Sequence, residues 1–140
     1  MTDLAVALIL NGRPCEVRTP AHRTLLEILR DDLGASCLVL APRAAGCQVT
    51  TVRGLGDGDR LHPLQEAFVT QGGIQCGFCI PGMILTAYAF LRDHPAASRA
   101  EIRRAIAGNL CRCTGYTKII DAIASVVPGR GAGEPGAAGG

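Results

Sequence analysis

The hydrophobic and polar positions separate a first part of the chain with short β-branched runs from a second part with helical periodicity. The apolar run Leu4–Leu10, closed by the turn pair Asn11–Gly12, and the run Cys15–Thr19 predict a β-hairpin. Because the run Leu4–Leu10 is short and follows Asp3 rather than a basic region, it indicates a strand and not a signal peptide or a membrane span.

A helix is predicted next, over Thr24–Leu33. Thr24 and Glu27 form a capping-box pattern, leucine and isoleucine residues then recur on one face, and Gly34 ends the helix. The first half is completed by a shorter helix and a β-branched strand, Ser36–Ala45 and Gln48–Arg53. Pro42 disfavours a regular helix in the first of these. The order of the first half is therefore β-β-α-(α)-β.

A glycine-rich polar stretch, Gly54–His62, predicts a linker between two compact pieces. Only helical patterns follow it, each bounded by proline, glycine or a capping hydroxyl. These predicted helices run from Pro63 to Gly72, from Pro81 to Leu91, from Ser98 to Gly108 and from Thr114 to Val127. The residues after Val127 are mainly glycine, alanine and proline, which predicts a disordered tail.

Composition narrows the class of protein. An apolar content of 48% is enough for a globular core. The net charge of +2 is spread along the chain, and 3 Phe and 2 Tyr with no Trp leave little for base stacking, so nucleic acid is a poor partner. With no export signal of the common type, 7 cysteines indicate metal or redox chemistry rather than a disulfide framework.

Two turns hold closely spaced cysteines, Cys76-Gly77-Phe78-Cys79 and Cys111-Arg112-Cys113. Each turn lies between predicted helices, at or just before a helix start, where free backbone N–H groups and the helix dipole stabilise thiolate. Packing the two helical hairpins face to face brings both turns to one end. The sequence therefore predicts a four-sulfur site.

The number of thiols fits zinc and an iron–sulfur cluster equally, because both take tetrahedral thiolate ligation. The second pair has C-x-C spacing, which is less usual for a zinc knuckle. A thioredoxin-like redox pair at Cys76 and Cys79 is a third option, but the alternating strands and helices of that fold are missing around it. Spacing alone leaves iron–sulfur and zinc about even.

The segments Gln75–Met83 and Gly108–Tyr116 resemble the helical [2Fe–2S] domain of the molybdenum hydroxylases, the family of xanthine dehydrogenase, aldehyde oxidoreductase and carbon monoxide dehydrogenase. The resemblance covers Gly54–Val127. It implies one [2Fe–2S] cluster in a four-helix bundle, with Cys113 and Gln75 also facing the molybdopterin of a partner subunit. The cluster ligands that it implies are Cys76, Cys79, Cys111 and Cys113.

The first half resembles the plant-type ferredoxin domain of the same family, with one defect. The family's loop with three cysteines, C-x4-C-x2-C, is missing between Gly34 and Ser36, and only Cys37 remains at a ligand position. One thiol cannot hold a two-iron cluster, so a second cluster should be absent. The expected class is α+β: a truncated β-grasp over 1–53, a helical cluster domain over 54–127 and a disordered tail over 128–140.

The resemblance implies an electron-transfer subunit of an oxidoreductase, with a molybdopterin-binding large subunit and an FAD-binding medium subunit as partners. We expect it in the cytoplasm, with a periplasmic location inside a folded exported complex as the alternative. No Ser/His/Asp set, paired carboxylates or phosphate loop is found, so no catalytic residue is predicted. The competing hypotheses are a structural or assembly module with zinc in the same thiolates and a remnant without metal.

The remaining candidate ligands have simpler interpretations. Isolated cysteines are usually small apolar core residues, and isolated histidines in polar surroundings are usually solvated. These interpretations apply to Cys15, Cys37, Cys47, His22, His62 and His94. Arg112, between two predicted ligands, is expected to face solvent.

Overall fold

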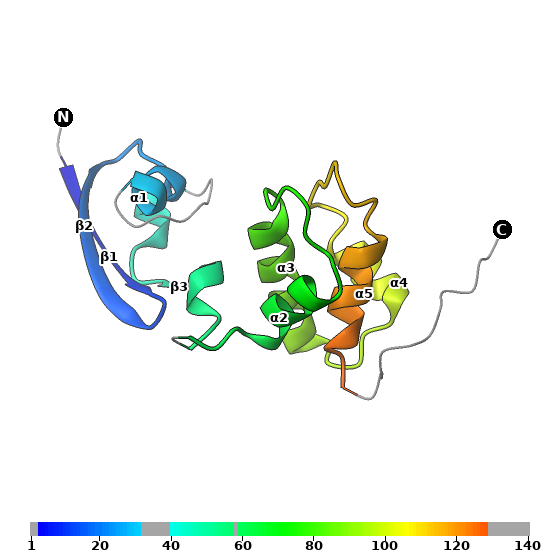
Figure 1. Cartoon of the computed structure of the whole chain (residues 1–140). Helices are drawn as coiled ribbons and strands as arrows, with labels where there is room; N and C mark the ends of the chain where they lie inside the picture. Colours follow the sequence, from blue (N-terminus) through cyan, green and yellow to red (C-terminus); the bar gives the residue numbers. More distant parts are fainter. Residues whose placement is uncertain (1–2, 32–39, 58, 129–140) are drawn as a thin grey trace. The chain divides into compact units, whose positions relative to one another are not determined.

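The structure is a computed structural model that describes residues 3–31, 40–57 and 59–128. The chain forms two compact units, Met1–Asp57 and Gly58–Gly140 (Figure 1). The first combines a small sheet with helical segments, and the described part of the second is helical. The α+β class is therefore confirmed.

The predicted hairpin is confirmed and is longer than its apolar runs. Strands β1 (Asp3–Leu10) and β2 (Arg13–Pro20) pair antiparallel, with Leu8 opposite Cys15. Both turn residues have left-handed backbones, with φ of 49° at Asn11 and 79° at Gly12. Such a turn matches the twist of the two strands, and asparagine and glycine adopt it at the least steric cost.

The strand predicted over Gln48–Arg53 is much shorter in the structure. Strand β3 (Gln48–Val49) pairs parallel with the end of β1, which gives the sheet order β2-β1-β3. Beyond it, the side chain of Asn11 accepts a hydrogen bond from the Thr51 amide at 2.8 Å. The chain then enters a 3₁₀ turn, η2 (Val52–Gly54), because β1 has ended and offers no further partner.

Helix α1 (Leu25–Asp31) begins where the capping box predicts. The Glu27 amide donates to Thr24 Oγ1 at 3.2 Å, and the Thr24 amide donates to the Glu27 carboxylate at 2.7 Å. The predicted last residues of this helix, 32–33, lie outside the described residues. Of the predicted helix Ser36–Ala45, the described part forms a 3₁₀ turn, η1 (Ala41–Ala44), with Pro42 near its start.

The core of the first unit lies between the hairpin and α1 (Figure 1). Burial alternates along β1, so that Val6 and Leu8 face inward while Ala7 faces solvent. Each fully buried leucine or valine contributes about 1.5–3 kcal/mol. The buried members of this core are Val6, Leu8, Leu25, Leu29 and Ala44, and Leu10, Cys15 and Val49 pack against them.

Residues 59–128 contain helices α2 (Pro63–Thr70), α3 (Ile80–Asp93), α4 (Arg99–Ala105) and α5 (Thr117–Ser125). Each of them contacts two others: α2 contacts α3 and α5, and α4 contacts α3 and α5. Their apolar faces are buried, as the periodicity predicts. The fully buried side chains include Leu64, Phe68, Met83, Ile102, Ile106, Ile119 and Ile123.

Helix α2 begins at Pro63, as predicted, but two residues at helix starts have other roles than predicted. His62, predicted to be a solvated loop residue, is half-buried and caps α2, because its Nδ1 accepts the Leu64 amide at 3.2 Å and its ring packs edge-on against Tyr88. Thr114 does not cap α5; that position belongs to Tyr116, which has a left-handed backbone. The capping box of α4, Ser98 with Glu101, is confirmed.

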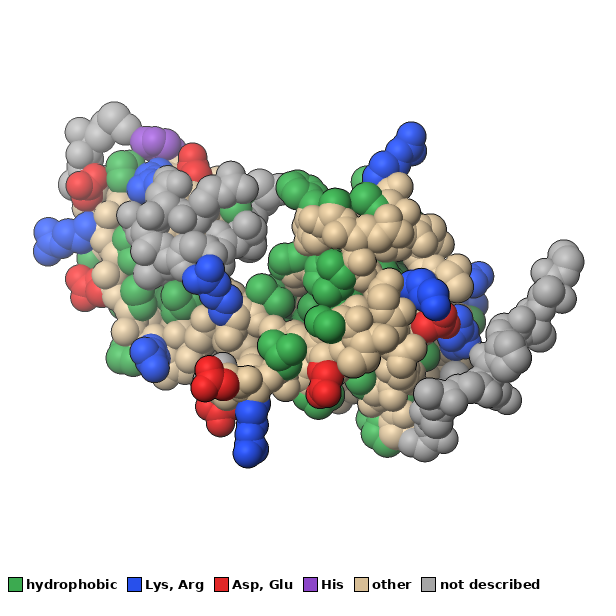
Figure 2. All heavy atoms as spheres, in the orientation of Figure 1, with side chains coloured by type: hydrophobic (Ala, Val, Ile, Leu, Met, Phe, Trp, Pro, Cys, Tyr) green, Lys and Arg blue, Asp and Glu red, His purple; other side chains and the backbone are tan. Residues whose placement is uncertain are grey.

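Figure 2 shows Lys and Arg side chains interspersed with Asp and Glu on the visible face, in keeping with the spread of charge along the sequence. Among the described residues, no helix has the length and apolar character needed to cross a membrane.

Candidate metal centre

The first cysteine turn, Cys76–Cys79, contains Gly77 and is followed directly by helix α3. Gly77 has a φ of 83°, a conformation that residues with a Cβ adopt at a cost. This lets the chain fold back, so that the Phe78 amide donates to the Cys76 sulfur. Cys79 is the N-cap of α3, and its side chain is half-buried.

The second cysteine turn is held by hydroxyl groups. Thr114 Oγ1 lies 3.1 Å from Cys111 Sγ and also accepts the Tyr116 amide at 3.2 Å. The backbone N–H groups of Cys113 and Thr114 are directed at the Cys111 sulfur. Three donors therefore converge on Cys111, an arrangement that favours thiolate.

The four predicted ligands approach one another as two pairs, each with one cysteine from either turn. Cys113 Sγ donates to Cys76 Sγ at 3.4 Å. The Cys79 and Cys111 thiols are likewise close enough for each to shift the pKa of the other. The structure therefore brings together all four cysteines that the sequence singled out.

The surroundings shift the pKa of each thiol differently. The Thr114 hydroxyl, helped by backbone donors, lowers the pKa of Cys111 to about 7. Burial, with the nearby Cys111 second, raises the pKa of Cys79 to about 11. The Phe78 amide and the Cys113 thiol lower the pKa of Cys76, and the interaction with Cys76 raises that of Cys113. Each pair therefore contains one sulfur that favours thiolate.

The donor set fits a two-iron cluster. Two sulfurs on one tetrahedral metal, with bonds of about 2.3 Å, lie about 3.8 Å apart, and the 3.4 Å between Cys76 and Cys113 is close to that value. Within residues 3–31, 40–57 and 59–128, no three His, Cys, Asp or Glu side chains group as a single metal ion would require.

The end of the unit that carries these turns is exposed and partly apolar. Phe78, between the first two cysteines, is 92% exposed, and Leu110, just before the second pair, is 85% exposed. Gln75, Cys76 and Cys113 are exposed beside them. Large apolar side chains at such exposure are typical of surfaces that a partner covers.

The other predicted residues have mixed outcomes. Cys15 packs against the first core, as predicted. Cys47, predicted to be a core residue, is exposed, and its Sγ lies 3.7 Å from the Arg43 carbonyl oxygen, because it follows the glycine turn at 46 rather than an apolar strand. Cys37 lies outside the described residues. His22, His94 and Arg112 are exposed, as predicted.

The sequence patterns predict no role at the site for Asn109, Thr114 or Tyr116. All three bond to the second turn or tie it to α3. The signal that could have found them is their position directly beside the cysteines, inside the segment that carries the family resemblance.

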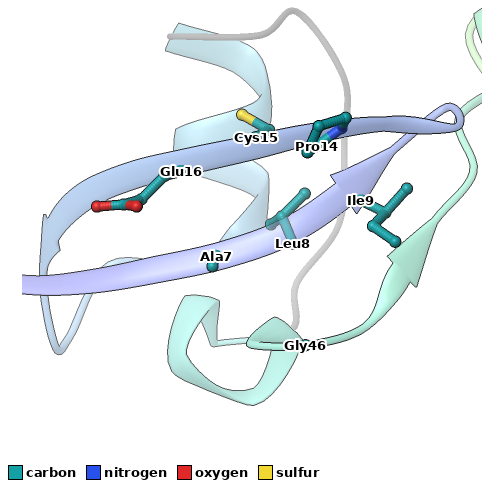
Figure 3. Close-up of a pocket in the computed structure, with 7 residues that line it drawn as sticks. All are labelled: Ala7, Leu8, Ile9, Pro14, Cys15, Glu16 and Gly46. Carbon is teal, nitrogen blue, oxygen red and sulfur yellow. The ribbon is translucent and has the colours of Figure 1, made fainter.

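The first unit has a pocket of about 420 Å³, which is not part of this centre. It is lined by β1, β2 and the turn before β3 (Figure 3): Ala7, Leu8, Ile9, Pro14, Cys15, Glu16 and Gly46. One half-buried thiol and one carboxylate do not make a metal or catalytic constellation.

Residues 51–124 match the family model of the [2Fe-2S] binding domain. The chain belongs to this family, as an iron–sulfur member of the molybdenum hydroxylases. It is 51% identical over 90 residues to aldehyde oxidase 1 of Cavia porcellus, and 41% identical over 109 residues to aldehyde oxidase of Homo sapiens. These matches cover 62% and 77% of this chain but only 7% and 8% of the two relatives.

Solved structures agree. A chain of quinoline 2-oxidoreductase from Pseudomonas putida 86 superposes with a TM-score of 0.84 at 36% identity, covering 88% of this chain and 91% of that one. Aldehyde oxidoreductase from Desulfovibrio desulfuricans ATCC 27774 gives a TM-score of 0.80 at 32% identity, covering 88% of this chain and 16% of that one. The same fold thus corresponds to nearly a whole chain in one relative and to a small part of the chain in the other.

Proposed function

We propose that this chain is an electron-transfer component of a molybdenum-cofactor hydroxylase or dehydrogenase. It would take electrons from the molybdopterin site of a large subunit and pass them toward a flavin or another acceptor. The observation that carries the proposal is the pairing of four thiols across two turns, within a chain of the [2Fe-2S] binding family.

Cys76, Cys79, Cys111 and Cys113 would hold one [2Fe–2S] cluster, which supplies one-electron transfer when bound. We assign Cys76 with Cys113 to one iron and Cys79 with Cys111 to the other, because these are the pairs that approach each other. The zinc alternative needs all four sulfurs around one ion, whereas two separated pairs favour two irons.

The chain's own donors would tune that site. The Phe78 amide is directed at Cys76, and the Thr114 hydroxyl and the Cys113 amide at Cys111. Hydrogen bonds to ligand sulfurs spread their negative charge and favour the more negative, reduced state. Loss of such a donor should therefore lower the reduction potential.

The exposed end around the cysteine turns is the surface we assign to the large subunit. Gln75 and Cys113 are proposed to face its molybdopterin, and both are exposed. Phe78 and Leu110 would be covered in the same contact, since little within their own unit covers them. An FAD-binding subunit as the onward partner, and a cytoplasmic location, stay predictions from the resemblance.

The domain plan is part of the proposal. Residues 1–53 would be a reduced β-grasp without its cluster loop, residues 54–127 a four-helix bundle that carries the cluster, and residues 128–140 a tail. The hairpin with α1 on one face supports the first of these, and the contacts of α2 and α4 with both other helices support the second. A second cluster is not expected, because Cys37 alone cannot hold one.

Metal analysis of protein purified without air tests the proposal. About two irons and two acid-labile sulfides per chain, a visible spectrum and one rhombic EPR signal after dithionite reduction would support it. One zinc per chain without visible absorbance would favour the alternative of a structural module that binds zinc. Two distinct EPR signals would contradict the prediction of a single cluster. Co-purification with a molybdopterin-containing chain would support the assigned partner.

A further inference from the structure

Tyr116 has an unfavourable backbone. Its φ is 69°, a left-handed conformation that a tyrosine rarely adopts, and it follows Gly115, which has a φ of 64°. A glycine would suit this position better on backbone grounds. A strained residue beside predicted ligands indicates that its side chain is needed there.

The phenol hydroxyl of Tyr116 ties the second cysteine turn together. It accepts the Cys111 amide at 2.8 Å and donates to the Asn109 carbonyl oxygen at 3.1 Å. Both bonds reach backward along the chain, across the residues that carry the second cysteine pair. The hydroxyl thereby fixes the backbone on the N-terminal side of Cys111.

The Asn109 side chain joins that turn to the helix of the first turn. Its Nδ2 donates to Thr86 Oγ1 at 2.7 Å and to the Gly82 carbonyl oxygen at 3.2 Å. Thr86 and Gly82 are both in α3, whose N-cap is Cys79. Hydrogen bonds therefore run without a break from α3 through Asn109 and Tyr116 to Cys111.

We propose that Asn109 and Tyr116 are positioning residues that hold the two cysteine turns in register before any metal is bound. This inference rests on the proposed function, because it assigns a role at the same centre. The bonds fix Cys111 relative to Cys79, and the short Cys111–Cys113 spacing then brings Cys113 to Cys76. The unloaded chain presents two formed thiol pairs and does not have to assemble them around the cluster.

Disulfide trapping in the metal-free chain tests this without any cluster. Mild oxidation followed by peptide mapping gives the rate at which Cys76 and Cys113 cross-link, which the 3.4 Å approach makes fast in the parent chain. Tyr116→Phe removes only the hydroxyl and both of its hydrogen bonds. It should slow this cross-link at least fivefold, because one lost hydrogen bond already has about that effect. Tyr88→Phe, at the other tyrosine of the sequence, should leave the rate unchanged.

A second pair of variants protects the test against misfolding. Thr86→Val keeps the volume but removes the acceptor for Asn109, and should also slow the cross-link. Thr86→Ser keeps the hydroxyl, and its Cys76–Cys113 cross-link should form at the parent rate. In loaded protein, Tyr116→Phe and Thr86→Val should shorten the half-life of the visible absorbance under chelator about fivefold.

Parent rates of cross-linking in both Tyr116→Phe and Thr86→Val would overturn the proposal. Hydrogen exchange gives a second way to overturn it. If Tyr116→Phe speeds amide exchange in α2 and α5 as much as at the Cys111 amide, the Tyr116 hydroxyl contributes to the general stability of the unit and not to positioning. A parent chain that never binds iron, yet cross-links in a Tyr116-dependent way, would refute the proposed function and leave the positioning role intact.

Discussion

Cys76 and Cys113 lie 37 positions apart in the chain, yet their Sγ atoms approach to 3.4 Å. Each cysteine comes from a different helical hairpin, so the approach links the two halves of the helical unit. Neither turn supplies a complete ligand set alone. A cluster at this site should therefore stabilise the packing of α2–α5 as well as carry electrons.

Removing one ligand should prevent an intact cluster. We expect Cys113→Ser to lower the iron content and abolish the EPR signal of the reduced protein, because one iron loses a thiolate. Cys47→Ser, at an exposed thiol of the first unit, is the matched control and should keep both. Cys37→Ser should likewise leave the signal unchanged. A full signal in Cys113→Ser would contradict the ligand assignment.

The exposed side chain of Phe78 should matter for association and not for folding. Because it is 92% exposed, Phe78→Ala should leave the melting temperature unchanged. If the large subunit covers it, the dissociation constant for that subunit should rise about tenfold, as for a buried aromatic anchor. Val69→Ala, at a 60% exposed position of α2, is the control for simple loss of surface apolarity. Equal affinity of Phe78→Ala and the parent would place the contact elsewhere.

Acid should weaken the start of α4. Hydrogen bonds from the Ser98 hydroxyl and amide lower the pKa of Glu101 below its usual 4.5, so the folded chain favours the carboxylate. That stabilisation is fully present above pH 4.5 and is lost as the pH falls through the lowered value. Thermal melts of metal-free Glu101→Gln and parent protein should therefore converge in acid. Ser98→Ala should reduce the pH dependence in the same way, and parallel curves for Glu101→Gln and parent would count against this cap.

Asn11 should hold the first unit together through its side chain. Asn11 Nδ2 donates to Thr51 Oγ1 at 2.9 Å, and its Oδ1 accepts the Thr51 amide. Asn11→Gly keeps the left-handed turn and should cost about 1–3 kcal/mol for these bonds. Asn11→Ala should cost about 1 kcal/mol more, because its Cβ disfavours that backbone. A Cβ at Gly54 would collide with the same side chain, so the approach is tight.

Hydrogen exchange of the Ile9 and Asn11 amides measures this loss, because they donate to Cys47 and Val49 across the β1–β3 pairing. Thr50→Ala, at the exposed residue before Thr51, is the control and should exchange like the parent. Unchanged exchange in Asn11→Gly would show that the sheet does not depend on the Asn11 side chain.

Several elements could be predicted because their signals are local. The Asn11–Gly12 turn, the capping boxes at Thr24 and Ser98 and the apolar face of α5 each depend on residues a few positions apart. Predictions that depended on residues distant in the sequence were less accurate. The strand beginning at Gln48 ends early because its partner β1 ends at Leu10, which the strand's own residues do not reveal.

The same distinction applies to the site. The sequence by itself singled out the four cysteines of the candidate site, since thiol type, spacing and glycine turns are local features of two short segments. Only the tertiary structure decided that Cys76 pairs with Cys113 and Cys79 with Cys111, and that Asn109 and Tyr116 hold the two turns in register. These contacts join residues from different helices, and their distances follow from how α2–α5 pack and not from any periodicity along the chain.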